Sequence, residues 1–231
     1  MIEFASLAIT DGIAVINLDD GKANALSFDM MATLNAALDE AEANADVIIL
    51  TSRRAAMCAG FDLNVMRNEP DKVADMVGRG GRLMLRIFTS NKPIIIASPG
   101  HGIAAGCLLM LTGDYRIGVE GESRYGLNES AIGMVLPPYG IDLARFKINN
   151  KHLDRCFVGA ELLDSATAKE FGILDEVATS DALMACAMEK AQEFQKLDGK
   201  AYAGNKKLVR GAIAEKIMAD LEARTGLSVG T

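Results

Sequence analysis

Two short apolar runs, at residues 47–51 and 93–98, constrain the fold of this chain more than any other feature. Each is almost continuously apolar, which is typical of a strand that is buried on both faces of a parallel sheet. A third strand is predicted at 115–119, and apolar residues recur with helical spacing at 28–43 and 70–89. Strands that alternate with helices in this way predict an α/β chain built from repeating turns.

The two ends of the chain depart from this alternation. Residues 4–18 alternate between apolar and polar positions around an Asp-Gly turn at 11–12, which predicts a β-hairpin. After about residue 138 the strands nearly stop and helical patterns take over. The helices predicted there span 139–147, 152–158, 165–171, 181–197 and 200–223. We therefore predict a core at 1–165 and a helical C-terminal subdomain at 166–231, which together function as a single domain.

Composition and charge argue against several classes of protein. The formal net charge of −7 disfavours a nucleic-acid or anionic-membrane binder, because phosphate binding needs a basic surface. No apolar stretch approaches the roughly 20 residues of a membrane span, and the first residues lack a signal-peptide pattern. The four cysteines have no paired spacing, which predicts reduced thiols in a soluble, cytoplasmic protein. The two histidines have no ligand cluster nearby, so no metal site is expected.

Two segments, at residues 57–63 and 100–107, place small residues where an apolar strand is followed by a helix. The N–H groups at the start of a helix lack intrahelical partners and can point at an anionic oxygen. Two such donors that converge on one point would form an oxyanion hole. This device stabilises the negative charge that develops when a thioester carbonyl becomes an enolate.

The second segment also allows a different interpretation, as a dinucleotide-binding loop. Gly100, Gly102 and Gly106 follow a strand, and Glu120 lies about twenty residues beyond the first of them. However, the third glycine comes one position late, Pro99 precedes the loop, and about a hundred residues precede the motif. A nicotinamide-dependent oxidoreductase therefore stays a minor alternative.

Glu129 is the candidate acid or base. It follows a strand and a glycine turn, and it precedes the almost wholly apolar segment 130–138. A carboxylate next to apolar surface has a raised proton affinity, because desolvation disfavours its charged form, and such a group suits a base near neutral pH. The alternative is a solvated loop glutamate or a helix cap.

Taken together, these motifs resemble the crotonase (enoyl-CoA hydratase/isomerase) superfamily. The resemblance runs over nearly the whole chain, from 24–26 through 59–63 to 171–177. Three segments are most similar to Δ3,Δ2-enoyl-CoA isomerases: 105–108, 114–117 and 124–129. The resemblance implies an α/β fold with a crotonase-like ββα spiral core and a helical C-terminal part, assembled as a homotrimer or a homohexamer.

The resemblance also implies a role for individual residues. The backbone N–H groups of Phe61 and Ala105 would form the oxyanion hole, and Glu129 would move the proton. Coenzyme A would enter only as part of the acyl-CoA substrate, with no separate cofactor. The implied substrate site comprises Lys22, Ala23, Ala25, Ala59, Gly60, Phe61, Asp62, Leu63, Ala105 and Leu108.

Leu108 favours an isomerase over a hydratase. The hydratases of this superfamily carry a second glutamate at this position, and adding water to a double bond is naturally served by two carboxylates. Moving a double bond needs one base. A hydratase, hydrolase or dehalogenase acting on another acyl-CoA remains an alternative within the family. A non-catalytic CoA-binding or assembly protein is the alternative from another class.

Two further sets of residues could have either a functional role or an ordinary structural one. Lys206, Lys207 and Arg210 have helical spacing and could reach a CoA phosphate of a neighbouring subunit, but a solvated helix face is favoured. Cys58 and Cys107 flank the two loops, but each lies in an apolar stretch without a partner base, which disfavours a nucleophile.

Overall fold

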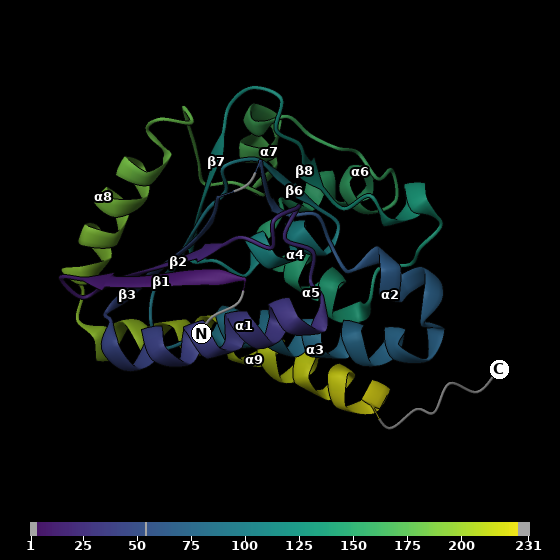
Figure 1. Cartoon of the computed structure of the whole chain (residues 1–231), viewed down its shortest axis with the longest axis horizontal. Helices are drawn as coiled ribbons and strands as arrows, with labels where there is room; N and C mark the ends of the chain where they lie inside the picture. The colour runs from purple at the N-terminus through teal and green to yellow at the C-terminus, as the bar shows by residue number, and fades with distance from the viewer. Residues whose placement is uncertain (1–3, 54, 226–231) are drawn as a thin grey trace.

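The fold centres on a six-stranded sheet in the order β1-β2-β3-β5-β7-β9 (Figure 1), in a computed structural model that describes residues 4–53 and 55–225. The first two strands form an antiparallel hairpin and the others pair in parallel, as the sequence predicts. The strands are β1 Ala5–Thr10, β2 Ile13–Leu18, β3 Val47–Ser52, β5 Ile94–Ala97, β7 Tyr115–Val119 and β9 Glu176–Ala178. Strand β9 was not expected, and it ties the C-terminal third of the chain into this sheet. The division at residue 165 stays a prediction.

A second, three-stranded parallel sheet was missed by the sequence analysis. It has the order β4-β6-β8, with β4 at Ala56–Cys58, β6 at His101–Ile103 and β8 at Tyr125–Gly126. Helix α4 (Ala105–Leu111) begins two residues after the end of β6. Strands of two or three residues are too short to show an alternating pattern. Each of these strands leads directly into one of the predicted site segments.

Helices cover both faces of the large sheet. Helix α8 (Leu183–Gln195) lies against β3, β5 and β7, where Ala187 and Ala191 are buried. On the other side, a layer of three helices comprises α1 (Phe28–Asn44), α3 (Pro70–Thr89) and α9 (Gly199–Thr225) (Figure 1). Helix α3 contacts both α1 and α9.

The shorter helices connect this frame to the small sheet. They are α2 Leu63–Asn68, α5 Pro138–Lys147, α6 Leu153–Phe157 and α7 Ser165–Phe171, with 3-10 turns at Glu129–Ile132 and Asn150–His152. The predicted helix at 152–158 is therefore split between a 3-10 turn and α6. Ser27 caps the start of α1 by accepting a hydrogen bond from the Met30 N–H (3.1 Å). Within the described residues, no helix is both long enough and apolar enough to cross a bilayer.

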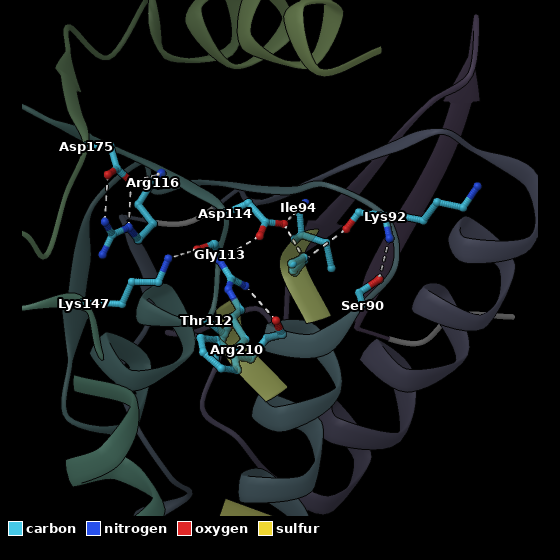
Figure 2. A network of polar contacts seen from close by, with 12 residues as sticks. Ser90, Lys92, Ile94, Thr112, Gly113, Asp114, Arg116, Lys147, Asp175 and Arg210 are labelled. Carbon is cyan, nitrogen blue, oxygen red and sulfur yellow. Dashed lines mark hydrogen bonds and ion pairs between the residues drawn. The ribbon is translucent and has the colours of Figure 1, made fainter. Parts of the chain in front are cut away.

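A buried ion-pair network at the N-terminal ends of β5 and β7 holds α9 against the large sheet (Figure 2). The Asp114 carboxylate accepts from Lys206 Nζ (2.8 Å), from Arg210 (2.9 Å) and from the Ile94 N–H (2.7 Å). The side chains of Asp114 and Lys206 are each 5% exposed, and that of Arg210 is 10% exposed. Both interpretations of Lys206 and Arg210 from the sequence are therefore wrong, because these cations are buried and paired. Lys207, the third of these cations, is exposed, as the interpretation as a solvated helix face predicts.

Lys147, at the end of α5, gives the fold a pH dependence that can be measured. Its Nζ donates to the Gly113 carbonyl oxygen at 2.9 Å (Figure 2). Burial, together with the charges of Arg116 and Arg210, lowers the pKa of Lys147 to about 7, against the opposing charges of Asp114 and Asp175. Above that pH the folded chain has released this proton while the unfolded chain still holds it. The free energy of unfolding is therefore expected to rise with pH, by at most about 1.4 kcal/mol per unit.

The rise is confined to a window from about pH 7 to 8.5. Burial raises the pKa of Cys58 to about 12 and that of Cys156 to about 11, so unfolded thiols lose protons first at higher pH and stability then falls. Urea unfolding followed by circular dichroism across this window measures the slope. A Lys147→Met variant should lack the Lys147 component of the rise, and an identical slope in the two proteins would contradict its origin.

Candidate active site

A cavity of about 890 Å³ brings the two predicted loops and the predicted acid together. Its walls come from α2 and α3 on one side and from α4, the 3-10 turn at Glu129–Ile132 and the start of α5 on the other. The predicted site residues that line it are Ala59, Gly60, Phe61, Leu63, Ala105, Leu108 and Glu129. Segments that lie far apart in the sequence therefore meet at one site.

The first loop connects β4 to α2. Gly60 has a φ of +103°, a backbone conformation that favours glycine. Asp62 caps α2 by accepting from the Asn64 N–H at 2.8 Å, and it is not part of the cavity wall. The predicted role of Asp62 in a CoA site therefore has a structural alternative, as the cap that starts the helix.

The loop at 22–26 lies alongside this first loop but does not line the cavity. The Ala59 N–H donates to the Ala23 carbonyl oxygen (3.0 Å), and the Leu26 N–H donates to the Gly60 carbonyl oxygen (2.8 Å). Lys22 is exposed, and Ala25 is half-buried. Lys22, Ala23 and Ala25 thus lie beside the site, where a ligand that extends out of the cavity could reach them.

Asn24, to which the sequence alone assigns no role of its own, holds this loop in place. Its side chain is fully buried and donates to Ser52 Oγ (2.6 Å), and its Oδ1 accepts from the Asp20 N–H (3.0 Å). Its φ of +52° is one that asparagine tolerates better than most residues. The signal that could have revealed it was an asparagine in a short loop that follows Gly21.

The second loop connects β6 to α4 and lies directly against the first. A Cβ added at Gly106 would overlap the carbonyl oxygen of Cys58, so only glycine allows this close approach. A Cβ added at Gly60 would lie 3.8 Å from the Ala105 nitrogen. Within residues 4–53 and 55–225, the N–H groups of Phe61 and Ala105 donate to no protein acceptor. Two unused donors therefore border the same cavity, the arrangement that an oxyanion hole requires.

Ala104 stores backbone strain at this loop. It lies at φ +53° and ψ −128°, a region rarely occupied by residues other than glycine, which costs on the order of 1–3 kcal/mol. Ala104→Gly is expected to raise the free energy of unfolding by about 1 kcal/mol, because part of the relief is offset by the greater freedom of glycine in the unfolded chain. Urea unfolding measures the change. Ala32→Gly, at an exposed position inside α1, is the matched control and should lower the free energy of unfolding by about 1 kcal/mol. A loss of stability in both variants would contradict the proposal that Ala104 is strained.

Glu129 is buried at the cavity wall. It is 7% exposed, and within the described part of the chain its Oε2 has no hydrogen-bond partner. Burial raises the pKa of Glu129 above its usual value, against a hydrogen bond from its own backbone that lowers it. The interpretation as a solvated loop glutamate is therefore wrong. Leu108, 1% exposed, lines the same cavity and supplies apolar wall where the hydratases carry their second glutamate.

The other chemical interpretations find no support in the geometry. Cys58 and Cys107 are buried, and burial raises the pKa of both thiols, so neither is an activated nucleophile. Gly100 and Gly102 belong to the entry and middle of strand β6 rather than to a phosphate-binding helix start, which contradicts the dinucleotide interpretation. Among the described residues, no three histidine, cysteine or acidic side chains gather as a metal site.

The opposite wall of the cavity was not foreseen. It consists of α3 with Val73, Val77 and Gly78, and it is closed by Tyr139 and Leu221. In the sequence the apolar spacing of these helices reads as ordinary core packing, and only the tertiary structure shows that part of each apolar face borders a cavity.

Comparisons with known proteins identify related sequences. The sequence matches the enoyl-CoA hydratase/isomerase family over residues 8–230. Mouse mitochondrial enoyl-CoA delta isomerase 1 is 30% identical over 218 residues, 92% of this chain and 75% of that protein. The 2,3-dehydroadipyl-CoA hydratase of Escherichia coli K12 is 27% identical over 187 residues, 81% of this chain and 72% of that protein.

Solved structures show the same fold. An enoyl-CoA hydratase/isomerase family protein from Pseudomonas syringae superposes with a TM-score of 0.95 at 34% identity, over 99% of this chain and 100% of that one. Human mitochondrial delta3-delta2-enoyl-CoA isomerase superposes with a TM-score of 0.90 at 27% identity, over 95% of this chain and 90% of that one. The resemblance and the fold class inferred from the sequence are confirmed, and this chain belongs to the enoyl-CoA hydratase/isomerase family.

Proposed function

We propose that the chain moves the double bond of a 3-enoyl-CoA to form a 2-enoyl-CoA, with Glu129 as the proton carrier. One observation supports this choice above all others. Of the described residues that line the cavity, Glu129 alone is acidic, and its buried Oε2 has no protein partner. A single carboxylate in apolar surroundings suits a proton transfer between two carbons better than the activation of water.

The proposed mechanism uses the groups that border the cavity. The Glu129 carboxylate removes a proton from C2, and the electron pair left behind is delocalised onto the thioester oxygen. The N–H groups of Phe61 and Ala105 stabilise this oxyanion, which exists only during the reaction. Protonated Glu129 then returns the proton to C4, and the double bond lies between C2 and C3. The proton balance closes within the site, so coenzyme A takes part only as a portion of the substrate.

The remainder of the CoA would extend past the rim of the cavity. Arg67, exposed on α2, is the basic residue among those that line the cavity within the described chain, and it offers a charge for a phosphate group. The loop at 22–26 lies on the same side as the first site loop. The homotrimer or homohexamer and the cytoplasmic location both stay predictions.

The test compares two substrates with the purified protein. With 3-enoyl-CoA we expect the absorbance of the conjugated thioester to appear, and with 2-enoyl-CoA we expect it to persist. Rapid loss of that absorbance from 2-enoyl-CoA would contradict the isomerase and identify a hydratase. Binding of acyl-CoA with no turnover of either substrate would identify a non-catalytic protein.

A hydratase is the second candidate, and one feature favours it. Asn128 lines the cavity next to Glu129, and its Oδ1 is buried without a protein partner in the described residues. A polar group there could help to hold a water molecule beside the carboxylate, and relatives named as hydratases exist. The two-substrate test decides between the candidates.

A further inference from the structure

Helix α3 carries three glycines in its interior, at positions 78, 80 and 81. Glycine is the least favourable residue inside a helix apart from proline, so their accumulation calls for a structural reason. All three are buried. The surroundings of each position show which of them are explained by packing.

Close packing explains two of the three glycines. A Cβ added at Gly80 would lie 2.5 Å from a ring carbon of Phe61. One added at Gly81 would lie 2.6 Å from Leu221 and 2.9 Å from the Tyr139 ring. These two glycines therefore let neighbouring side chains touch the helix backbone.

Gly78 differs, because it is itself part of the cavity wall. It lies four residues after Ala74 and three before Gly81, so the three positions share one face of the helix. Ala74 also lines the cavity, and Gly81 abuts Leu221, which does as well. A side chain at position 78 would consequently project toward the cavity.

The burial of the lining residues gives the cavity a direction. Pro70 on α3 and Leu63 on α2 are exposed and form the open rim, together with Val135, which is 92% exposed. About 12 Å further along α3, at eight residues of helical rise, Gly78 is buried. There Tyr139 and Leu221, each 1% exposed, close the end of the cavity.

The side chains that bound this closed end are apolar apart from the Tyr139 hydroxyl, which donates to the Val77 carbonyl oxygen at 3.3 Å. The buried Oε2 of Glu129, which has no partner among the described residues, marks the reactive part of the same cavity. A ligand that fits both parts has a reactive head and an alkyl tail. We infer that the end bounded by α3, Tyr139 and Leu221 holds the alkyl tail of the acyl group, and that Gly78 sets the longest tail that fits. The inference rests on the proposed function only in assuming that the reactive head group lies beside Glu129.

The experiment measures how kcat/KM depends on tail length. The substrates are hexenoyl-, octenoyl-, decenoyl- and dodecenoyl-CoA with the double bond at C3. In the wild type, kcat/KM should rise by up to about fourfold for each added methylene until the cavity is full. Gly78→Leu should lower kcat/KM at least tenfold for the two longest tails and by less than about threefold for hexenoyl-CoA. Gly78→Ala should show a smaller loss in the same order.

Gly204→Leu is the matched control. Position 204 is exposed on α9 with no atom within 4 Å of an added Cβ, so this variant makes the same chemical change away from the cavity. Its tail-length profile should equal that of the wild type. Equal losses for all tails in both Gly78 variants, or a wild-type profile that falls from hexenoyl-CoA onward, would overturn the inference.

Calorimetry with saturated acyl-CoAs separates this inference from the proposed function, because these ligands cannot react. Their dissociation constants should follow the same order of tail lengths, and Gly78→Leu should weaken only the longer ones. If that pattern holds while no 3-enoyl-CoA is isomerised, the proposed function fails and the tail site stands. If isomerisation is found but affinity is independent of tail length, the tail site fails and the function stands.

Discussion

Replacing Glu129 by glutamine is expected to lower kcat for the isomerisation of 3-enoyl-CoA by roughly 10²- to 10⁴-fold. Glutamine keeps the size and shape of the side chain but cannot take up a proton from C2. No other acidic residue of the described chain lines the cavity and could replace it. Stopped-flow or steady-state absorbance of the conjugated thioester measures the loss.

The same variant should keep its fold, which separates chemistry from stability. The wild-type carboxylate is buried, and its Oε2 has no partner among the residues that the structure describes, so its charged form is disfavoured. A neutral amide removes that penalty, and the free energy of unfolding at neutral pH should stay equal or rise. Glu122→Gln, on an exposed turn, is the matched control for both measurements. Activity of Glu129→Gln within about tenfold of the wild type would contradict the proposed mechanism.

Replacing Asp114 by alanine is expected to lower the free energy of unfolding by about 3–5 kcal/mol. The change leaves Lys206 and Arg210 buried without their carboxylate and removes the acceptor of the Ile94 N–H. Uncompensated charge in a buried place is far more costly than the loss of an exposed pair. Urea unfolding followed by circular dichroism measures the loss.

Asp75→Ala is the matched control for this prediction. It breaks the Asp75–Arg79 pair, whose side chains are 54% and 61% exposed, and it should cost no more than about 1 kcal/mol. Adding Lys206→Met to Asp114→Ala should restore part of the stability, because one of the two unpaired charges is then gone. A loss below about 1 kcal/mol for Asp114→Ala would show that water reaches these cations.

Sequence patterns were sufficient for the parts of the fold with strong local signals. The hairpin, the apolar strands at 47–51 and 93–98, and the long helices at 28–43 and 70–89 were all found within a few residues. These elements show a clear periodicity over many residues, and their caps are local as well. The small sheet was missed because β4, β6 and β8 are too short to show a period and pair only through distant segments.

The charged residues show the same limit. The spacing of Lys206 and Arg210 correctly places them on one face of a helix. Nothing local shows that Asp114, more than ninety residues earlier, lies against that face. Whether a cation is solvated or buried depends on what packs over it, and that is a long-range property of the chain.

By itself, the sequence determined which chemical groups are present and in what order: two loops of small residues, one glutamate before an apolar segment, and a leucine in place of a second acid. It thereby determined the family. Only the tertiary structure decided that Glu129 is buried, that its Oε2 lacks a partner within the described chain, and that Phe61 and Ala105 border the same cavity. The physical reason is that desolvation and close approach depend on atoms from segments that are distant in the chain, and no local pattern can encode them.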